Sequence, residues 1–180
     1  MYYNKTNTGG GVFMKEINIR DIKISAQEII SDNWGLVTAG TGDKFNSMTV
    51  SWGALGEIWG KDAAFIFVRH SRYTYELLEN NNIFTLSFYD GKYKPVLGKV
   101  YGTLSGRDND KTALSGFTPV TVDNAVTYAQ AKYTLVCRVM ASQDIGKESF
   151  IDPSVENWYN GDAIHKMYIG EILKVYEGDE

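Results

Sequence analysis

The sequence predicts a mainly antiparallel β protein, folded as a barrel with a few inserted helices, and three observations support this. The apolar stretches are mostly short, and they either alternate with period two or are rich in β-branched and aromatic residues. Regular helices do not separate the strands, as a doubly wound parallel sheet requires. The 18 glycines and only 3 prolines favour many tight turns over proline-rich linkers.

The first 13 residues differ from the rest of the chain, because they show no hydrophobic period and include a run of three glycines. The first patterned stretch begins at a second methionine, Met14. We therefore expect residues 1–13 to form an N-terminal tail, which is not native if translation starts at Met14. Residues 14–180 are expected to form a single domain.

The first half of the patterned chain predicts four strands and a helix. One stretch alternates cleanly, and another is a continuous apolar run that is typical of a buried strand. Ser71 follows this run and stands at the N-cap of a helix expected over residues 72–80. The four expected strands are 34–40, 47–52, 63–69 and 83–89.

The second half predicts two long strands with short helices around them. Residues 131–143 and 165–176 are long stretches rich in β-branched and aromatic side chains, which favours strands. The helices expected in this half are 95–104, a short one capped by Asp108 and ending at Leu114, and 150–159 with Pro153 near its start.

Composition and charge exclude several classes of function. A formal net charge of -4 argues against nucleic-acid binding, and no apolar run is long enough to span a bilayer. The N-terminus has no apolar signal core, so the cytoplasm is the expected compartment. The single cysteine, Cys137, cannot form an intrachain disulfide, which agrees with a reducing compartment. With only two histidines besides, we expect no metal-centred mechanism.

The second expected strand carries a row of hydroxyl groups. With period two, Ser47, Thr49 and Ser51 point to one face, while Met48 and Trp52 point to the other. A row of hydroxyls can hydrogen-bond the polar edge of a ligand or a phosphate. The alternative is an edge strand with one solvated face.

The segment Arg69–Thr74 joins the end of a buried strand to the start of a helix. A helix N-terminus has free N–H groups and a partial positive charge, so it attracts phosphate. Arg69 and Arg72 would add charge-assisted donors, and Ser71 and Thr74 would add hydroxyls. The alternative is an ordinary capped helix with two surface arginines.

A second candidate anion site lies in the segment Ser105–Lys111. Gly106 permits a sharp turn before a capped helix, and Arg107 and Lys111 are four residues apart, so they can share a face. The alternative is a solvated turn with local ion pairs. His165, which opens the last strand, is expected to be structural rather than catalytic.

Five segments of the chain occur in the order that one known family shows. They are Lys44–Gly53, Val68–Tyr75, Phe84–Phe88, Ser105–Lys111 and His165–Ile172. In these segments the chain resembles the flavin reductase-like FMN-binding proteins of the flavoredoxin branch, from about Asn33 to Tyr176. The family often has a cysteine before its Ser-Gly-Arg-Asp segment, where this chain has Tyr101-Gly-Thr-Leu, so we expect no thiol role there.

The resemblance implies a split β-barrel of Greek-key type that forms a homodimer and binds FMN non-covalently near the dimer interface. It assigns one set of residues to the isoalloxazine and ribityl chain, a second to the phosphate, and a third to the closing segment. These sets are Asn46, Met48, Thr49, Ser51 and Trp52; Arg69, Ser71, Tyr73 and Thr74; and Gly106, Arg107 and Lys111. The residue pattern adds Ser47 and Arg72 to the candidate site.

Two classes of function remain open. The first is a flavin-dependent oxidoreductase or electron carrier that takes electrons from a nicotinamide or a small redox protein. The flavin would supply the chemistry, so we assign no catalytic residue. The second is a non-catalytic module that holds a flavin or haem for storage or sensing. The sequence names neither the electron donor nor the acceptor, and it does not distinguish NADH from NADPH.

Overall fold

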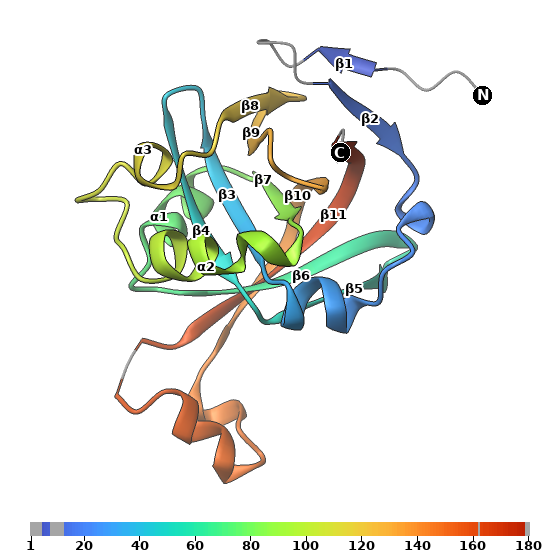
Figure 1. Cartoon of the computed structure of the whole chain (residues 1–180). Coiled ribbons are helices and arrows are strands. Elements are labelled where there is room, and N and C mark those ends of the chain that lie inside the picture. The colour runs from blue at the N-terminus through green and yellow to red at the C-terminus, as the bar shows by residue number, and fades with distance from the viewer. Residues whose placement is uncertain (1–4, 8–12, 162, 179–180) are drawn as a thin grey trace.

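The chain folds around one large antiparallel sheet, on which helices and a small second sheet are packed (Figure 1). The computed structural model describes residues 5–7, 13–161 and 163–178. Its strands are β1 (Lys5–Asn7), β2 (Phe13–Ile17), β3 (Gly35–Thr41), β4 (Lys44–Val50), β5 (Gly53–Ile58), β6 (Lys61–Arg69), β7 (Ile83–Phe88), β8 (Pro119–Val122), β9 (Ala125–Tyr128), β10 (Tyr133–Ile145) and β11 (His165–Gly178). The predicted mainly antiparallel β fold is confirmed.

The helical segments are short and cover the sheet rather than alternate regularly with its strands. They are the α-helices α1 (Tyr73–Asn80), α2 (Lys94–Val96) and α3 (Lys111–Ser115), the 3₁₀ turns η1 (Ile19–Asp21), η3 (Gly91–Tyr93), η5 (Lys147–Ser149) and η6 (Pro153–Trp158), and the π-type turns η2 (Gln27–Asp32) and η4 (Leu97–Gly102). The helix expected over 95–104 corresponds to α2 and η4.

Strand β11 is the centre of the large sheet, because it pairs with three other strands. It pairs with β10 along almost its whole length, with β6 through its first half, and with β2 near its end. Gly170 lies in its middle, and a Cβ there would come within 2.7 Å of the Phe84 ring. A side chain at this position would therefore displace Phe84 from the core.

The strand order is β1-β2-β11-β10-β7-β3-β4, with β6 also on β11 and β5 on β6. Register shifts in the β10–β11 ladder mark bulges, which bend and twist a strand pair. Within the described residues the sheet is not closed, because β4 and β6 share no hydrogen-bonded ladder. The structure therefore confirms the antiparallel sheet with inserted helices, whereas the described residues do not show the expected closure into a barrel.

The sheet separates two apolar cores. One core contains side chains from β3, β4, β6, β7 and β10, and Val37, Ile66 and Leu135 in it are almost fully buried. The other lies beneath η4 and the β8–β9 hairpin and is rich in aromatic rings. In this second core, the ring centroid of Phe117 is 5.7 Å from that of Tyr101 and 5.6 Å from that of Tyr128.

An arm, which we define as residues 146–161, follows the end of β10 and precedes the start of β11. It projects from the body of the molecule (Figure 1). The expected helix over 150–159 is here the 3₁₀ turn η6, with Pro153 at its start as predicted. Asp152 caps this turn by accepting a 2.9 Å hydrogen bond from the backbone N–H of Ser154.

Two predicted helix caps are wrong. Asp108 does not cap α3, because its own N–H bonds to the Ser105 carbonyl in a turn, and the helix begins after Asp110 instead. Ser71 does not cap α1 either. The N-cap is Arg72, whose N–H bonds back to the Arg69 carbonyl, and the cap makes no side-chain hydrogen bond.

The sequence pattern does not predict β5, β8 or β9. Strand β5 contains two glycines and is largely exposed, and β8 and β9 have only four residues each. The expected tail contains β1, which pairs with β2 through Thr6 and Met14. Residues 1–4 and 8–12 of that tail lie outside the described residues.

A chain that begins at Met14 is expected to keep nearly the full stability. Met14 is completely buried, and the truncation leaves the four residue pairs between β2 and β11 in place. The melting temperature should fall by no more than a few degrees. In the full-length chain, Met14→Ala should cost about 2–5 kcal/mol because it empties a buried site. A truncation as damaging as Met14→Ala would show that residues 1–13 are a structural part of the fold.

Candidate functional site

Two adjoining cavities lie on the body of the molecule, and the arm contributes Trp158 to the larger of them. The larger, about 270 Å³, is named the aromatic cavity here, and its lining is Met48, Thr49, Val50, Ser51, Trp52, Phe67, Arg69, Arg72, Trp158 and His165. The smaller, about 150 Å³, is named the anion cavity, and its lining is Asn46, Met48, Arg69, Ser71, Arg72, Tyr73, Thr74, Thr103, Leu104, Ser105, Gly106, Arg107 and Lys111. Met48, Arg69 and Arg72 line both cavities, so the two adjoin.

The structure brings almost all of the predicted site residues to these two cavities. The exception is Ser47, which lines a neighbouring cavity on the far side of Asn46 and Lys111. Its hydroxyl hydrogen-bonds with those of Thr38, at 2.8 Å, and Tyr128, at 2.9 Å, inside the protein. Thr49 also donates a hydrogen bond within the protein, to the Leu97 carbonyl. Two of the three expected hydroxyls therefore make hydrogen bonds that stabilise the fold.

Aromatic side chains from distant parts of the chain meet in the aromatic cavity. The ring centroid of Trp52 lies 5.6 Å from that of Trp158 on the arm and 5.0 Å from that of His165 on β11. His165 is nearly buried, and its Nδ1 is 3.1 Å from the Tyr159 hydroxyl. These rings give the cavity flat apolar walls of the kind that suit a flat ligand.

The sequence pattern did not single out Phe67 or Trp158 as site residues, and it treated His165 as structural. The register of β6 against β11 places Phe67 opposite Met167 and Arg69 opposite His165. Trp158 lies in the aromatic cavity because the arm folds back toward the body. The run of aromatic residues at Trp158-Tyr159 was the one local signal that could have indicated its role.

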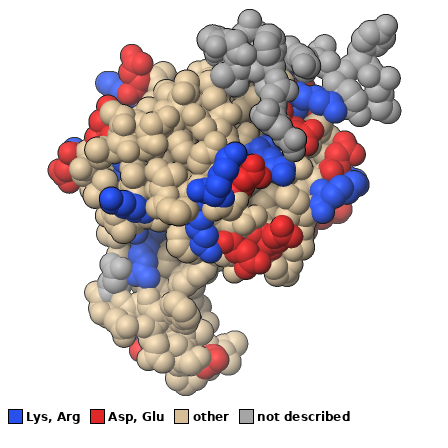
Figure 2. Space-filling view, in the orientation of Figure 1, with Lys and Arg blue, Asp and Glu red and all other residues tan. Residues whose placement is uncertain are grey.

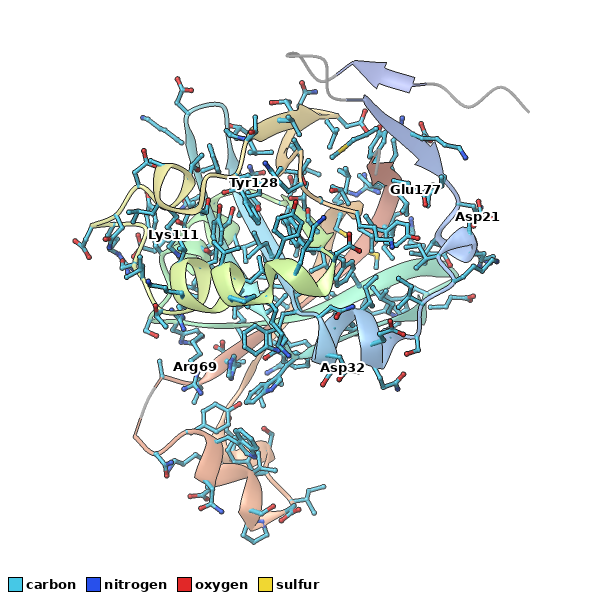
Figure 3. The ribbon with its side chains drawn as sticks, in the orientation of Figure 1. Asp21, Asp32, Arg69, Lys111, Tyr128 and Glu177 are labelled. Carbon is cyan, nitrogen blue, oxygen red and sulfur yellow. The ribbon has the colours of Figure 1, made fainter. Side chains whose placement is uncertain are left out.

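Arg69 holds the arm against the body. Its guanidinium donates hydrogen bonds to the carbonyls of Trp158, at 3.0 Å, and Ala163, at 3.3 Å, and it lies 5.3 Å from the centroid of the Tyr159 ring. Figure 3 shows Arg69 where the arm joins the body. Arg69 was predicted to meet a phosphate, and the structure places it at the base of the arm as well as at the edge of both cavities.

Two cationic side chains come together in the anion cavity. Arg72 stands directly before α1. Lys111 begins α3 (Figure 3) and is buried. Burial, and then the nearby charge of Arg72, lower the pKa of Lys111 to about 8. Neither side chain has an ion-pair partner in the part of the chain that the structure describes. The cavity therefore carries positive charge that an anion can neutralise.

The polar groups around these cations are held in place by close contacts. Asn46 donates a 2.7 Å hydrogen bond to the Thr74 hydroxyl in the first turn of α1, and both side chains are buried. Gly106 packs against Asn46 so tightly that a Cβ there would come within 1.9 Å of the Asn46 amide oxygen. A glycine is needed at position 106 because any side chain would displace Asn46.

Arg107 fastens the segment after η4 to α1. It donates hydrogen bonds to the Ser71 carbonyl, at 3.2 Å, and to the Glu76 carboxylate, and it lies 5.4 Å from the centroid of the Tyr73 ring. Its charge is thus already partnered, and its role is to close one side of the anion cavity.

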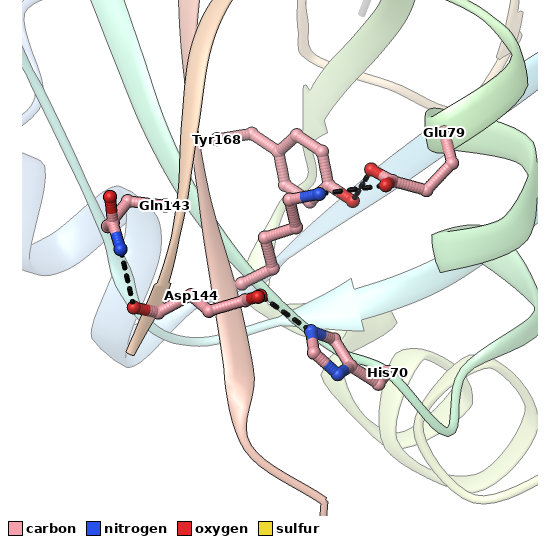
Figure 4. A network of polar contacts seen from close by, with 6 residues as sticks. His70, Glu79, Gln143, Asp144 and Tyr168 are labelled. Carbon is pink, nitrogen blue, oxygen red and sulfur yellow. Dashed lines mark hydrogen bonds and ion pairs between the residues drawn. The ribbon is translucent and has the colours of Figure 1, made fainter. Parts of the chain in front are cut away.

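A polar network holds α1 and the preceding turn against β10 and β11 (Figure 4). Glu79 accepts 2.7 Å hydrogen bonds from both Lys166 and Tyr168. Burial opposes ionisation of Glu79, but these two hydrogen bonds outweigh it and lower the pKa of the carboxyl. His70 lies 2.7 Å from the Asp144 carboxylate. The network fixes both ends of the segment that carries Ser71, Arg72 and Thr74.

The arrangement suits a flat aromatic ligand that ends in a phosphate. The aromatic cavity can enclose the ring, and the anion cavity offers Arg72, Lys111 and the N-terminus of α1 to the negative group. No cluster of metal-ligating side chains occurs in residues 5–7, 13–161 and 163–178. Across the same residues, no helix has the length and apolar character to cross a membrane.

Comparison with known proteins identifies the family. The flavin reductase like domain family matches residues 30–180, most of the chain. None of the curated proteins compared with the chain matches it significantly.

Several solved structures share the fold. A flavoredoxin from Methanosarcina acetivorans is 23% identical over 87% of this chain and 75% of that one, with a TM-score of 0.62. An FMN-binding protein from Thermus thermophilus with bound 1-cyclohex-2-enone is 17% identical over 80% and 69%, with a TM-score of 0.63. An NADH:FAD oxidoreductase from Streptomyces globisporus is 17% identical over 81% and 78%, with a TM-score of 0.60. The resemblance that the sequence motifs indicated is confirmed, and the chain belongs to the flavin reductase like domain family.

Proposed function

We propose that the chain binds FMN non-covalently and acts as an oxidoreductase or electron carrier in the cytoplasm. The observation that carries this proposal is the meeting of Arg72 and buried Lys111 at the start of α1, with no carboxylate paired to either in the described chain. A phosphate would supply the missing negative charge. The adjoining aromatic cavity supports a flavin as the group that the phosphate carries.

In this proposal the isoalloxazine occupies the aromatic cavity, and the phosphate occupies the anion cavity. Met48, Ser51 and Trp52 would line the ring, while Ser71 and Thr74 would add hydroxyls near the phosphate. Bound flavin would supply the electron-transfer chemistry. The protein would position it, and Trp52 and Trp158 would restrict water over the ring. We also propose that the open sheet is a split barrel of Greek-key type.

The electron donor is proposed to be a nicotinamide or a small redox protein. The relatives support this proposal, since one is described as an NADH:FAD oxidoreductase and another as a flavoredoxin. The alternative function is a module that stores or senses a flavin or haem without turnover.

We further propose that the protein is a homodimer whose interface includes the arm. Ile151 is 99% exposed and Trp158 is 66% exposed, although both are large apolar side chains. Figure 2 shows that the visible surface of the arm carries few charged residues. A second copy can cover this surface and, with it, the open side of the aromatic cavity.

The purified protein is expected to be yellow, or to become yellow when FMN is added, and acid should release the flavin intact. Under anaerobic conditions, NADH or NADPH should bleach the flavin absorbance if the chain is a nicotinamide-linked oxidoreductase. Protein that binds FMN but is reduced by neither nicotinamide nor a small redox protein would favour the storage or sensing module. Protein that quenches no flavin fluorescence would contradict the proposed function.

Arg72→Ala should weaken FMN binding about tenfold or more while leaving riboflavin almost unchanged, because riboflavin lacks the phosphate. A hydrogen bond to a charged group is worth roughly 1.5–3 kcal/mol, and tenfold in affinity is about 1.4 kcal/mol. Arg69→Ala should weaken both ligands, since Arg69 holds the arm that carries Trp158. The control is Arg20→Ala, whose guanidinium pairs with Asp62 away from the site. Equal losses of the two ligands in Arg72→Ala would mean that this arginine acts through the fold.

Light scattering at micromolar concentration should report about twice the chain mass of 20.2 kDa. Ile151→Asp should shift the protein toward the monomer, because it places a charge on the proposed interface. Trp59→Asp is the matched control, since Trp59 is 62% exposed but lies on the β5–β6 turn rather than the arm. A wild-type chain that is monomeric and still retains FMN would refute the shared site.

A further inference from the structure

Lys111 is a buried amine whose hydrogen-bond partners are neutral. Its residue is only 6% exposed, and its Nζ donates to the carbonyls of Ser47, at 3.0 Å, and Tyr101, at 3.4 Å. It also lies 6.0 Å from the centroid of the Tyr101 ring. Lysine is rarely buried this deeply without a carboxylate partner, so keeping Lys111 protonated at this position costs free energy.

The charged and titratable groups around Lys111 do not neutralise it. Arg72, from the turn before α1, repels its positive form. Arg107 is paired with Glu76, and Asp110, whose carboxylate caps α3 at the Ala113 N–H, forms no ion pair with Lys111. From η4, the Tyr101 phenol stays neutral because burial and the nearby Tyr128 raise its pKa. Asp43 and Tyr128 line the neighbouring cavity, which Lys111 also borders.

The two carbonyls that contact Lys111 are enough to accept both N–H groups of a neutral amine. An ammonium group has three N–H donors, whereas a neutral amine has two. Protonation therefore adds one donor that the two carbonyls do not use. Lys111 lines the anion cavity, where a phosphate oxygen can accept this third hydrogen.

We propose that Lys111 takes up a proton from solvent when the phosphate of the ligand binds, so that this residue sets the pH range in which the site prefers FMN to riboflavin. The proposal rests on the proposed function, because it needs a phosphorylated flavin in the anion cavity. No bond other than that to the proton forms, and the buffer supplies the proton.

The size of the effect follows from the pKa of Lys111, which is lowered to about 8 before ligand binds. At pH 7 the amine is already mostly protonated, whereas at pH 9 about nine-tenths of it is neutral and must be protonated on binding. The phosphate of FMN has its second pKa near 6, so its charge hardly changes between pH 7 and 9. The affinity for FMN should therefore fall about tenfold over this range.

Riboflavin is the control ligand, because it has the same isoalloxazine ring and ribityl chain as FMN but no phosphate. Its affinity, measured by fluorescence quenching at pH 7, 8 and 9, gives the pH dependence of ring binding alone. The ratio of the FMN and riboflavin dissociation constants should rise about tenfold from pH 7 to 9. Lys111→Met should remove this change in the ratio, and Arg72→Ala should keep at least part of it.

The decisive measurement is titration calorimetry of the full chain with FMN at pH 9, in two buffers with different ionisation enthalpies. The difference should report uptake of close to one proton per FMN at pH 9 and almost none at pH 7. Lys111→Met should take up none at either pH, and circular dichroism shows whether it has folded. If that variant does not fold, the wild-type proton count alone decides. FMN binding without proton uptake at pH 9 would overturn this inference but leave the proposed function standing, whereas no FMN binding at any pH would overturn both.

Discussion

The pairing of β11 with three other strands is the constraint on which the rest of the structure depends. Because β10, β6 and β2 all bond to it, β11 joins the N-terminal strand, the β5–β6 hairpin and the central strands into one sheet. The absence of a side chain at Gly170 lets the Phe84 ring pack against the middle of β11. The same register sets His165 opposite Arg69, so the ladder that organises the sheet also builds the wall of the site.

The site is made where rigid elements end. Arg69 is the last residue of β6, and α1 begins a few residues later. The contacts of Glu79 with Lys166 and Tyr168 hold the far end of α1 against β11. The Arg69 guanidinium hydrogen-bonds to the arm, and the Arg107 guanidinium forms an ion pair with Glu76. Arg72 and Lys111 are left to recognise an anion. Under the proposed function, this division between cations that fasten the fold and cations that face the cavity would make the site selective for a phosphorylated ligand.

The sequence predicted the antiparallel β class, both long strands and about two-thirds of the residues that line the two cavities, because these follow from local periodicity and from motifs with a fixed order. Its departures from the structure concern contacts between distant segments and two local turns. Ser47 was expected to face a ligand, but its partners are Thr38 and Tyr128, which only the folded sheet brings near. The predicted caps Ser71 and Asp108 failed because backbone turns shifted the helix starts. Trp158 could not be placed without the arm, whose return path has no periodic signal.

The most direct test of the account is a crystal structure of the protein grown with FMN. The phosphate is expected to lie within hydrogen-bonding distance of Arg72 and Lys111, and the isoalloxazine is expected to lie in the aromatic cavity beside Met48 and Trp52. A flavin bound in the neighbouring cavity next to Asp43 and Tyr128, or with its ring at Lys111 and its phosphate at Trp158, would contradict it.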